Sequence, residues 1–198
     1  SGADIHASTA AEVFGVPVSE VTQAMRRDAK AVNFGIVYGI SNYGLSRNIN
    51  ITPRKAYEYI KRYFERFPAV KAYLDGLVDS AKKTGYAVTA FGRRRAIPEL
   101  NSAKFLERKF GERVAMNMQL QGTAADIIKL AMIAVHKRLS GMKSELILQV
   151  HDELIIDAAA DEADEVSGII KTEMENAVKL SVPLDVDISV GANWMECK

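Results

Sequence analysis

Four side chains that could bind a triphosphate and a base recur at every fourth position of one segment. Arg26, Lys30, Phe34 and Tyr38 lie in RRDAKAVNFGIVYG, and residues four apart lie above one another on a helix. At about 1.5 Å of rise per residue the series spans roughly 18 Å, from cations to aromatic rings. A nucleoside triphosphate, with phosphates at one end and a flat base at the other, would match this gradient. The alternative is that both aromatic residues belong to the hydrophobic core.

A pair of carboxylates lies between two apolar runs in SELILQVHDELIIDAA, where Asp152 and Glu153 follow His151. The pattern predicts a tight hairpin whose apolar strands hold the carboxylates on a rigid support. Carboxylate oxygens are ligands that Mg²⁺ prefers, and two Mg²⁺ ions that share carboxylates promote in-line attack on a phosphate. The alternative is a pair of solvated turn residues.

A second series at four-residue spacing consists of Arg113, Asn117 and Gln121 in ERVAMNMQLQGTAADI. Its apolar neighbours predict a largely buried helix, from which polar side chains would point at a ligand. All three supply hydrogen-bond donors, and the minor groove of DNA presents acceptors at every base pair. The alternative is a polar stripe on a surface helix.

The elements that must position these residues are mainly helical up to residue 139. Ser19 is the expected N-cap of the helix that carries the first series, and Gly39 its expected end. Thr52-Pro53 predicts the start of a helix that runs to Pro68. Further expected elements are a helix over residues 70–84, two short strands in 84–98 and one long helix over 103–139.

The last third of the sequence changes to a mixed pattern. After the hairpin, DEADEVSGIIKTEMENAVKL predicts an amphipathic helix, and PLDVDISVGANW alternates apolar and polar residues as a half-buried strand does. The chain is therefore expected to be α+β, with a helical part followed by a part that contains an antiparallel sheet.

Composition is that of an ordinary globular protein, with 198 residues, 48% hydrophobic and 26% charged. Cys197 is the single cysteine, which excludes an internal disulfide and fits a reducing, cytoplasmic setting. No run approaches about 18 apolar residues, and SGADIHAST is not a signal peptide. Neither a membrane span nor secretion is expected.

Charge is divided unevenly along the chain, although the net charge is only +1. Residues 26–113 contain 19 Lys and Arg against 8 Asp and Glu, whereas residues 140–198 contain 4 against 13. Two solvated faces would account for this division. The functional interpretation is a polyanion-binding lobe followed by a lobe with metal-binding carboxylates.

Three motifs in this order, RRDAKAVNFGIVYG, QGTAADIIK and QVHDEL, resemble the C-terminal part of the family A DNA polymerases of the bacterial DNA polymerase I type. DIHASTAAEVFG resembles the family's segment just before its long finger helix. The resemblance implies part of a right-hand polymerase fold, with helical fingers over residues 1–105 and the C-terminal part of the palm over 106–198. It implies an enzyme of DNA replication and repair that adds dNTPs to a primer 3′-OH. The single-subunit RNA polymerases are a less similar alternative.

The resemblance carries nucleotide-binding roles to five positions of this sequence. His6, Arg26 and Lys30 match residues that bind the phosphates of the incoming dNTP, and Lys30 is also the implied general acid for the pyrophosphate leaving group. Phe34 matches the residue that packs on the nucleotide sugar. Tyr38 matches the aromatic residue beside the templating position.

Further roles concern DNA and metal. The residues implied to contact primer–template DNA are Arg113, Asn117, Gln121 and His151. Asp152 matches one of two essential metal-binding aspartates and Glu153 its accessory carboxylate, so both are implied ligands of Mg²⁺, of which the family's reaction uses two ions.

One motif of the family has no counterpart here, because the sequence contains no DYSQIELR-like segment with the second essential aspartate. We therefore expect fingers plus part of the palm, and no nucleotide addition by this chain alone. Binding of nucleotide or DNA without catalysis is the alternative function for the isolated chain. Missing palm strands would leave an unpaired sheet edge, so self-association across that edge is expected.

Overall fold

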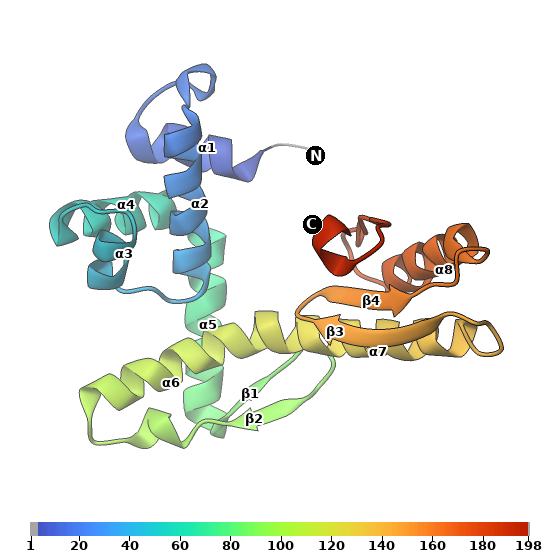
Figure 1. The fold of residues 1–198 in the computed structure, drawn as a ribbon. Coiled ribbons are helices and arrows are strands. Elements are labelled where there is room, and N and C mark those ends of the chain that lie inside the picture. Colours follow the sequence, from blue (N-terminus) through green and yellow to red (C-terminus); the bar gives the residue numbers. More distant parts are fainter. Residues whose placement is uncertain (1–3, 198) are drawn as a thin grey trace. The chain divides into compact units, whose positions relative to one another are not determined.

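Two compact units make up the chain, one extending to Leu120 and the other starting at Gln121. The computed structural model describes residues 4–197, and Figure 1 labels the elements along the chain. Helices predominate and both sheets are antiparallel, which confirms the α+β class. No helix within residues 4–197 has the length and apolar content needed to cross a membrane.

The first unit begins with helices that pack around one core (Figure 1). In chain order these elements are α1 (Ile5–Phe14), the 3-10 turn η1 (Val18–Glu20), α2 (Gln23–Val37), α3 (Asn42–Asn48), α4 (Pro53–Arg66) and α5 (Pro68–Thr84). Val32 and Leu45 are fully buried in this core, and Tyr59 and Tyr63 pack beside them. Full burial of a large apolar side chain stabilises a fold by about 1.5–3 kcal/mol.

Local signals fix where these helices begin and end. Thr22, whose hydroxyl accepts a backbone N–H, caps α2, so the expected cap Ser19 is wrong; Ser19 lies in η1 instead. Thr52 caps α4 with Pro53 in its first turn, as predicted. Gly85 ends α5 with φ 78°, also as predicted, because a left-handed residue there favours glycine.

A second core in the same unit joins α5 to a hairpin and to α6 (Phe105–Asn117). The predicted strands are present as β1 (Tyr86–Val88) and β2 (Arg94–Ala96), which pair in antiparallel fashion before the 3-10 turn η2 (Pro98–Asn101). The buried members of this core are Ala81, Ala87, Ile97, Leu100, Val114 and Ala115.

The expected single helix over residues 103–139 is wrong in one respect, because a π-helical turn interrupts it. Helix α6 ends at Asn117, the π turn η3 covers Met118–Gly122, and α7 (Thr123–Arg138) follows. A π turn holds more residues than an α turn, so side chains four apart no longer stay in line across it. The expected burial is also only partial, since Val114 and Ala115 are buried whereas Leu120 is exposed.

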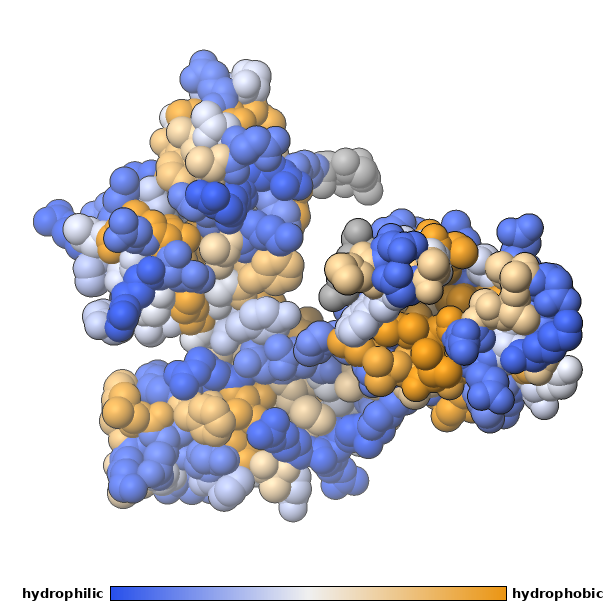
Figure 2. Space-filling view, viewed as in Figure 1, coloured by the Kyte–Doolittle hydropathy of each residue, from blue (hydrophilic) through white to orange (hydrophobic). Residues whose placement is uncertain are grey.

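The second unit packs α7 and α8 (Ala163–Glu175) with the hairpin of β3 (Glu145–Val150) and β4 (Glu153–Asp157). The predicted hairpin and amphipathic helix are confirmed. Val135, Leu139, Val166 and Ile169 are buried, and Leu146, Leu154 and Ile156 pack against them. Exposed apolar side chains of this unit include Ile147, Val190 and Met195, and Figure 2 shows apolar residues gathered on one face of it.

The predicted strand in residues 183–194 is absent from the structure, in which residues 183–190 form no strand and the 3-10 turn η4 (Trp194–Cys197) ends the described chain. The alternation itself is present, since Leu184, Val186 and Ile188 are half-buried between exposed neighbours. A strand also needs hydrogen-bonded pairing with a neighbour, and within residues 4–197 this segment has none. Apolar periodicity therefore predicted the burial but not the pairing.

Candidate functional site

The first series lies on one exposed side of α2, and we call this surface, together with His6 of α1, the α1–α2 face. Arg26, Lys30 and Phe34 are helical, and Tyr38 is the C-cap residue. Phe34 and Tyr38 keep 46% and 37% of their surface exposed, while Val32 and Ile36 fill the core. The alternative that the two aromatic residues are core residues is therefore wrong.

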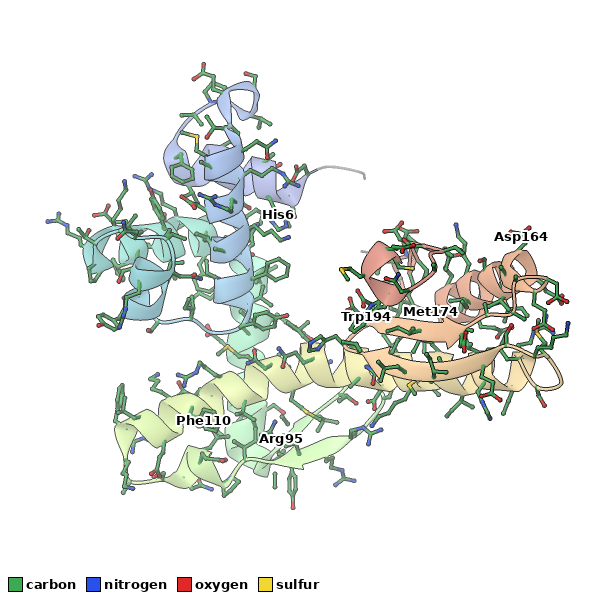
Figure 3. The ribbon with its side chains drawn as sticks, in the orientation of Figure 1. His6, Arg95, Phe110, Asp164, Met174 and Trp194 are labelled. Carbon is green, nitrogen blue, oxygen red and sulfur yellow. The ribbon has the colours of Figure 1, made fainter. Side chains whose placement is uncertain are left out.

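Ring contacts connect the members of this face. The His6 and Phe34 ring centroids are 5.8 Å apart, and the Phe34 and Tyr38 rings stack with centroids 6.3 Å apart and planes 17° apart. The Lys30 ammonium lies 5.9 Å from the Phe34 ring centroid, within the range of a cation–π contact. Figure 3 places His6 on α1 beside α2. The result is a continuous row of rings with a cation beside it.

Asp4 links the start of α1 to Arg26. One Asp4 carboxylate oxygen accepts the backbone N–H groups of His6 and Ala7 at 2.9 and 3.1 Å, which caps α1. The other accepts the Arg26 Nε–H at 2.7 Å. The hydrogen bond from Arg26, with help from the Ala7 N–H, holds the pKa of Asp4 below its ordinary value of 3.8. A single carboxylate thus fixes His6 and Arg26 relative to each other.

Two glycines allow close packing at the end of α2. A Cβ on Gly35 would lie 2.9 Å from Ile40 Cγ2, so the glycine allows a close approach there. Gly39, just past the helix end as predicted, has φ 71°, and a Cβ there would clash with the Met116 methyl and lie 3.1 Å from Arg113 Cγ. The end of α2 therefore packs directly on α6.

The second series is only partly brought together. Arg113 and Asn117 lie on α6, with the Arg113 guanidinium 5.8 Å from the Phe110 ring centroid. The Asn117 side-chain oxygen is buried without a hydrogen-bond partner in the described structure. Gln121 is exposed, lies in η3 and belongs to the second unit. The π turn thus removes Gln121 from the helical line that the spacing predicted.

The hairpin tip, by which we mean His151, Asp152 and Glu153, is exposed. Val150 pairs with Glu153, so His151 and Asp152 form a two-residue connection, and the Gln149 amide donates to the His151 carbonyl. His151 has φ 54°, a left-handed conformation that is costly for a residue with a Cβ. In the described part of the chain, neither tip carboxylate makes a side-chain hydrogen bond or ion pair.

The strands beneath this tip are less enclosed than the sequence indicated. A bulge at Ile147 shifts the register between Leu146 and Leu148, and Ile147 and Leu148 are 59% and 47% exposed. One side of the hairpin packs on the core while the bulged side does not. Across residues 4–197 there is no group of three or more His, Cys, Asp or Glu placed to hold a metal ion.

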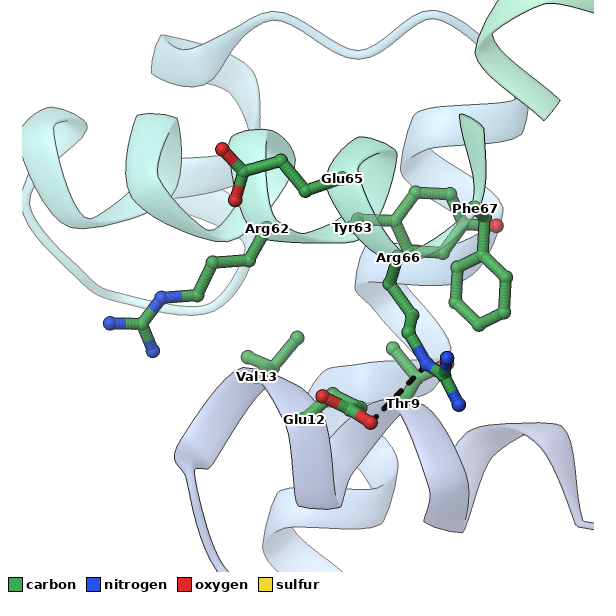
Figure 4. A pocket seen from close by; sticks show the side chains of 8 residues that line it. All are labelled: Thr9, Glu12, Val13, Arg62, Tyr63, Glu65, Arg66 and Phe67. Atoms are coloured by element: carbon green, nitrogen blue, oxygen red, sulfur yellow. Dashed lines mark ion pairs between the residues drawn. The ribbon is translucent and has the colours of Figure 1, made fainter. Parts of the chain in front are cut away.

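A separate pocket lies between α1 and α4, within the first unit (Figure 4). It is lined by Thr9, Glu12, Val13, Arg62, Tyr63, Glu65, Arg66 and Phe67. Arg66 and Glu12 form an ion pair at 3.3 Å across its mouth. Burial raises the pKa of Tyr63 on its inner wall.

Asp4 and Asn33 contribute to the α1–α2 face, although the sequence patterns did not single them out. The signal for Asp4 was present, because an Asp just before a helical pattern is a typical N-cap. Asn33 is buried and lies 3.0 Å from a His6 ring nitrogen, 27 residues away in sequence. No local pattern reveals such a tertiary contact.

The fold and these sites can be compared with known proteins. The model of DNA polymerase family A matches residues 1–196, and the chain belongs to this family. DNA polymerase I of Caldicellulosiruptor bescii is 55% identical over 197 residues, and DNA polymerase I of Lactococcus lactis subsp. lactis is 51% identical over 200 residues. These matches cover 98% and 100% of this chain, but the chain spans only 23% of the length of each relative.

A solved structure is similar over nearly the same range. The POL domain of Pol1 from M. smegmatis, in complex with DNA primer-template and dNTP, superposes with a TM-score of 0.91 at 42% identity. The match covers 99% of this chain and 35% of that chain. It confirms the prediction that the fold is part of a DNA polymerase I polymerase domain.

Proposed function

We propose that this chain forms the nucleotide-binding and part of the metal-binding site of a template-directed DNA polymerase, which adds dNTPs to a primer 3′-OH in cytoplasmic DNA replication and repair. The observation that carries the proposal is the α1–α2 face, where cations and stacked, exposed rings form one row. The M. smegmatis relative, described as a complex with primer-template and dNTP, supports the same partners.

In this proposal, the α1–α2 face binds the dNTP along its length. His6, Arg26 and Lys30 donate hydrogen bonds to the triphosphate, and Lys30 gives a proton to the leaving pyrophosphate. Phe34 packs against the sugar, and Tyr38 lies beside the templating base. Charge-assisted hydrogen bonds of this kind each contribute about 1.5–3 kcal/mol.

We propose that the hairpin tip supplies the metal ligands. Asp152 and Glu153 are exposed and free of cationic partners in the described structure, so their oxygens suit Mg²⁺, which keeps several waters. When bound, Mg²⁺ would neutralise phosphate charge during nucleotidyl transfer. The proposed contacts with primer–template come from Arg113, Asn117, Gln121 and His151. We keep the predicted division into fingers (1–105) and part of the palm (106–198) as a proposal.

For the isolated chain, we propose nucleotide and DNA binding without nucleotide addition. Two adjacent carboxylates on one turn do not supply the bridging ligands that two ions about 3.5–4 Å apart require. Primer extension with Mg²⁺ and all four dNTPs checks this, with a complete family A polymerase as the positive control. Templated incorporation by the purified chain would contradict the proposal.

Affinity for dNTP tests the binding role. Lys30→Ala should weaken dATP binding about 10- to 100-fold, because it removes one charge-assisted interaction. Lys55→Ala is the matched control, since Lys55 also lies over an aromatic ring, that of Tyr59, but on α4. Equal affinities of the two variants would show that the α1–α2 face does not bind phosphate.

The β3–β4 hairpin of the second unit has features that favour self-association. The β3–β4 hairpin is a two-stranded sheet within residues 4–197, and Ile147 and Leu148 are exposed on it. We propose that two copies associate across this hairpin, as unpaired edges with apolar side chains do. Sedimentation velocity should show a concentration-dependent dimer that Ile147→Lys abolishes. A monomer at all concentrations would contradict the proposal.

A further inference from the structure

The contact between Asn33 and His6 determines which ring nitrogen of His6 carries the proton. Asn33 is on the buried side of α2, 7% exposed, and its Nδ2 lies 3.0 Å from His6 Nδ1. An amide NH₂ is a donor only, so Nδ1 must accept. A neutral imidazole that accepts at Nδ1 carries its hydrogen at Nε2.

The amide orientation has a physical reason. As placed, the Asn33 Oδ1 is buried without a partner in the described structure. Turning the amide over would put Oδ1 against Nδ1 and leave both N–H groups of the buried amide unpaired, whereas the observed orientation leaves Oδ1 and one N–H unpaired. The orientation with Nδ2 towards His6 therefore leaves fewer donors unsatisfied.

We infer that Asn33 is a positioning residue that holds neutral His6 with its proton on Nε2, ready to donate to a nucleotide phosphate. The inference rests on the proposed dNTP-binding function. Nδ1 is the ring nitrogen that contacts buried Asn33, which leaves Nε2 for a ligand, and the Phe34 ring centroid lies 5.8 Å from that of His6. His6 then donates to an anion without first becoming charged.

The charged groups around His6 do not supply an alternative partner for Nδ1. Asp4 on the same helix accepts the His6 backbone N–H and the Arg26 guanidinium. Lys30 on α2 lies over the Phe34 ring. On the other elements that pack against α1, Arg66 of α4 is paired with Glu12, and Glu20 of η1 is exposed.

The substitution Asn33→Asp reverses the hydrogen bond. A carboxylate only accepts, so Nδ1 must carry the proton, and neutral His6 then presents a lone pair at Nε2. We expect dATP affinity to fall about tenfold in this variant at pH 8, because neutral His6 no longer has a hydrogen at Nε2 to donate. Asn42→Asp, exposed on α3, makes the same charge change as a control.

The direct test is the tautomer itself, measured by ¹⁵N NMR of the imidazole rings. The chain has three histidines, so His136→Gln and His151→Gln variants assign the signals. We expect a protonated Nε2 and an unprotonated Nδ1 for neutral His6, reversed by Asn33→Asp. A protonated Nδ1 in the unchanged chain overturns the inference, whether or not Asn33→Asp folds.

Measurements of dATP affinity distinguish a failure of the positioning role from a failure of the proposed function. If Lys30→Ala weakens dATP binding while Asn33→Asp changes the tautomer but not the affinity, the positioning role is wrong and the site stands. If Lys30→Ala has no effect, the proposed function fails, and a role of Asn33 in nucleotide binding fails with it.

Discussion

The α1–α2 face and the hairpin tip present opposite charges and are organised in opposite ways. On the α1–α2 face, Arg26 is bound to Asp4, His6 to Asn33, and Lys30 lies over Phe34. At the hairpin tip, Asp152 and Glu153 are exposed, and their side chains have no partner among residues 4–197.

This difference follows from chemistry. Cationic and aromatic groups find partners within the same unit, so a phosphate-binding surface can be arranged by the chain itself. Two adjacent carboxylates repel each other, and a bound cation would offset that repulsion. The first region is therefore held in place by contacts within the chain, whereas the proposed metal site at the second would take its geometry from the bound ion.

The packing beneath the α1–α2 face gives the largest expected effect. Gly39→Ala should lower the free energy of unfolding by about 2–4 kcal/mol, because a Cβ is strained at φ 71° and must displace Met116 and Arg113. Urea unfolding measures the change.

A matched glycine isolates the packing contribution. Gly85 also has a left-handed φ, 78°, but a Cβ there meets nothing within 4 Å. Gly85→Ala should therefore cost only the backbone strain, about 1–2 kcal/mol. Equal losses in the two variants would mean that α6 does not support the end of α2 through this contact.

The ion dependence of the hairpin tip can be measured with Mn²⁺ in place of Mg²⁺. Paramagnetic broadening should centre on residues 151–153. Asp152→Asn should lower the affinity for Mn²⁺ about tenfold, because it removes one of two carboxylates. Asp164→Asn, on the exposed side of α8, controls for the loss of one negative charge. Broadening that is unaffected by Asp152→Asn would place the ion elsewhere.

Backbone strain at the hairpin tip predicts an effect opposite in sign to that at Gly39. His151→Gly should raise the free energy of unfolding by about 0.5–1 kcal/mol, since relief at φ 54° exceeds the entropy that glycine adds to the unfolded chain. Asp152→Gly should lower it by about 0.5–1 kcal/mol, because Asp152 does not have a positive φ. Destabilisation by His151→Gly would show that the tip is not strained.

The smallest expected effect is the loss of folding stability in acid that depends on Asp4. Hydrogen bonding from Arg26, above all, lowers the pKa of Asp4 in the folded chain, so its contribution to stability is complete above its ordinary value of 3.8 and is lost as the pH falls through the lower folded value. Asp4→Asn should make the fall in stability below about pH 3.8 shallower. Asp79→Asn, exposed on α5, is the control, and identical acid profiles would contradict the link.

Elements whose signals are local could be predicted from the sequence. The Thr52-Pro53 helix start, the Gly85 helix end and the hairpin at His151-Asp152 were all predicted, because caps, glycines and short apolar runs act within a few residues. The four-residue spacing likewise predicted that Arg26 to Tyr38 share one side of a helix.

Features that depend on distant partners could not be predicted in this way. The π turn at Met118–Gly122 and the absent strand near Val186 reflect packing and pairing that periodicity does not encode. The contact between Asn33 and His6 joins two helices through residues that are 27 positions apart in sequence. The part of the site that fixes the geometry of His6 was therefore visible only in the structure.

Mapping of NMR shift changes during a dATP titration shows whether the α1–α2 face binds the triphosphate of a dNTP, as we propose. The largest shift changes should fall on His6, Arg26, Lys30, Phe34 and Tyr38. They should be absent when adenosine, which lacks the phosphates, replaces dATP. Shift changes centred elsewhere, or equal changes with adenosine, would show that the α1–α2 face does not bind the triphosphate.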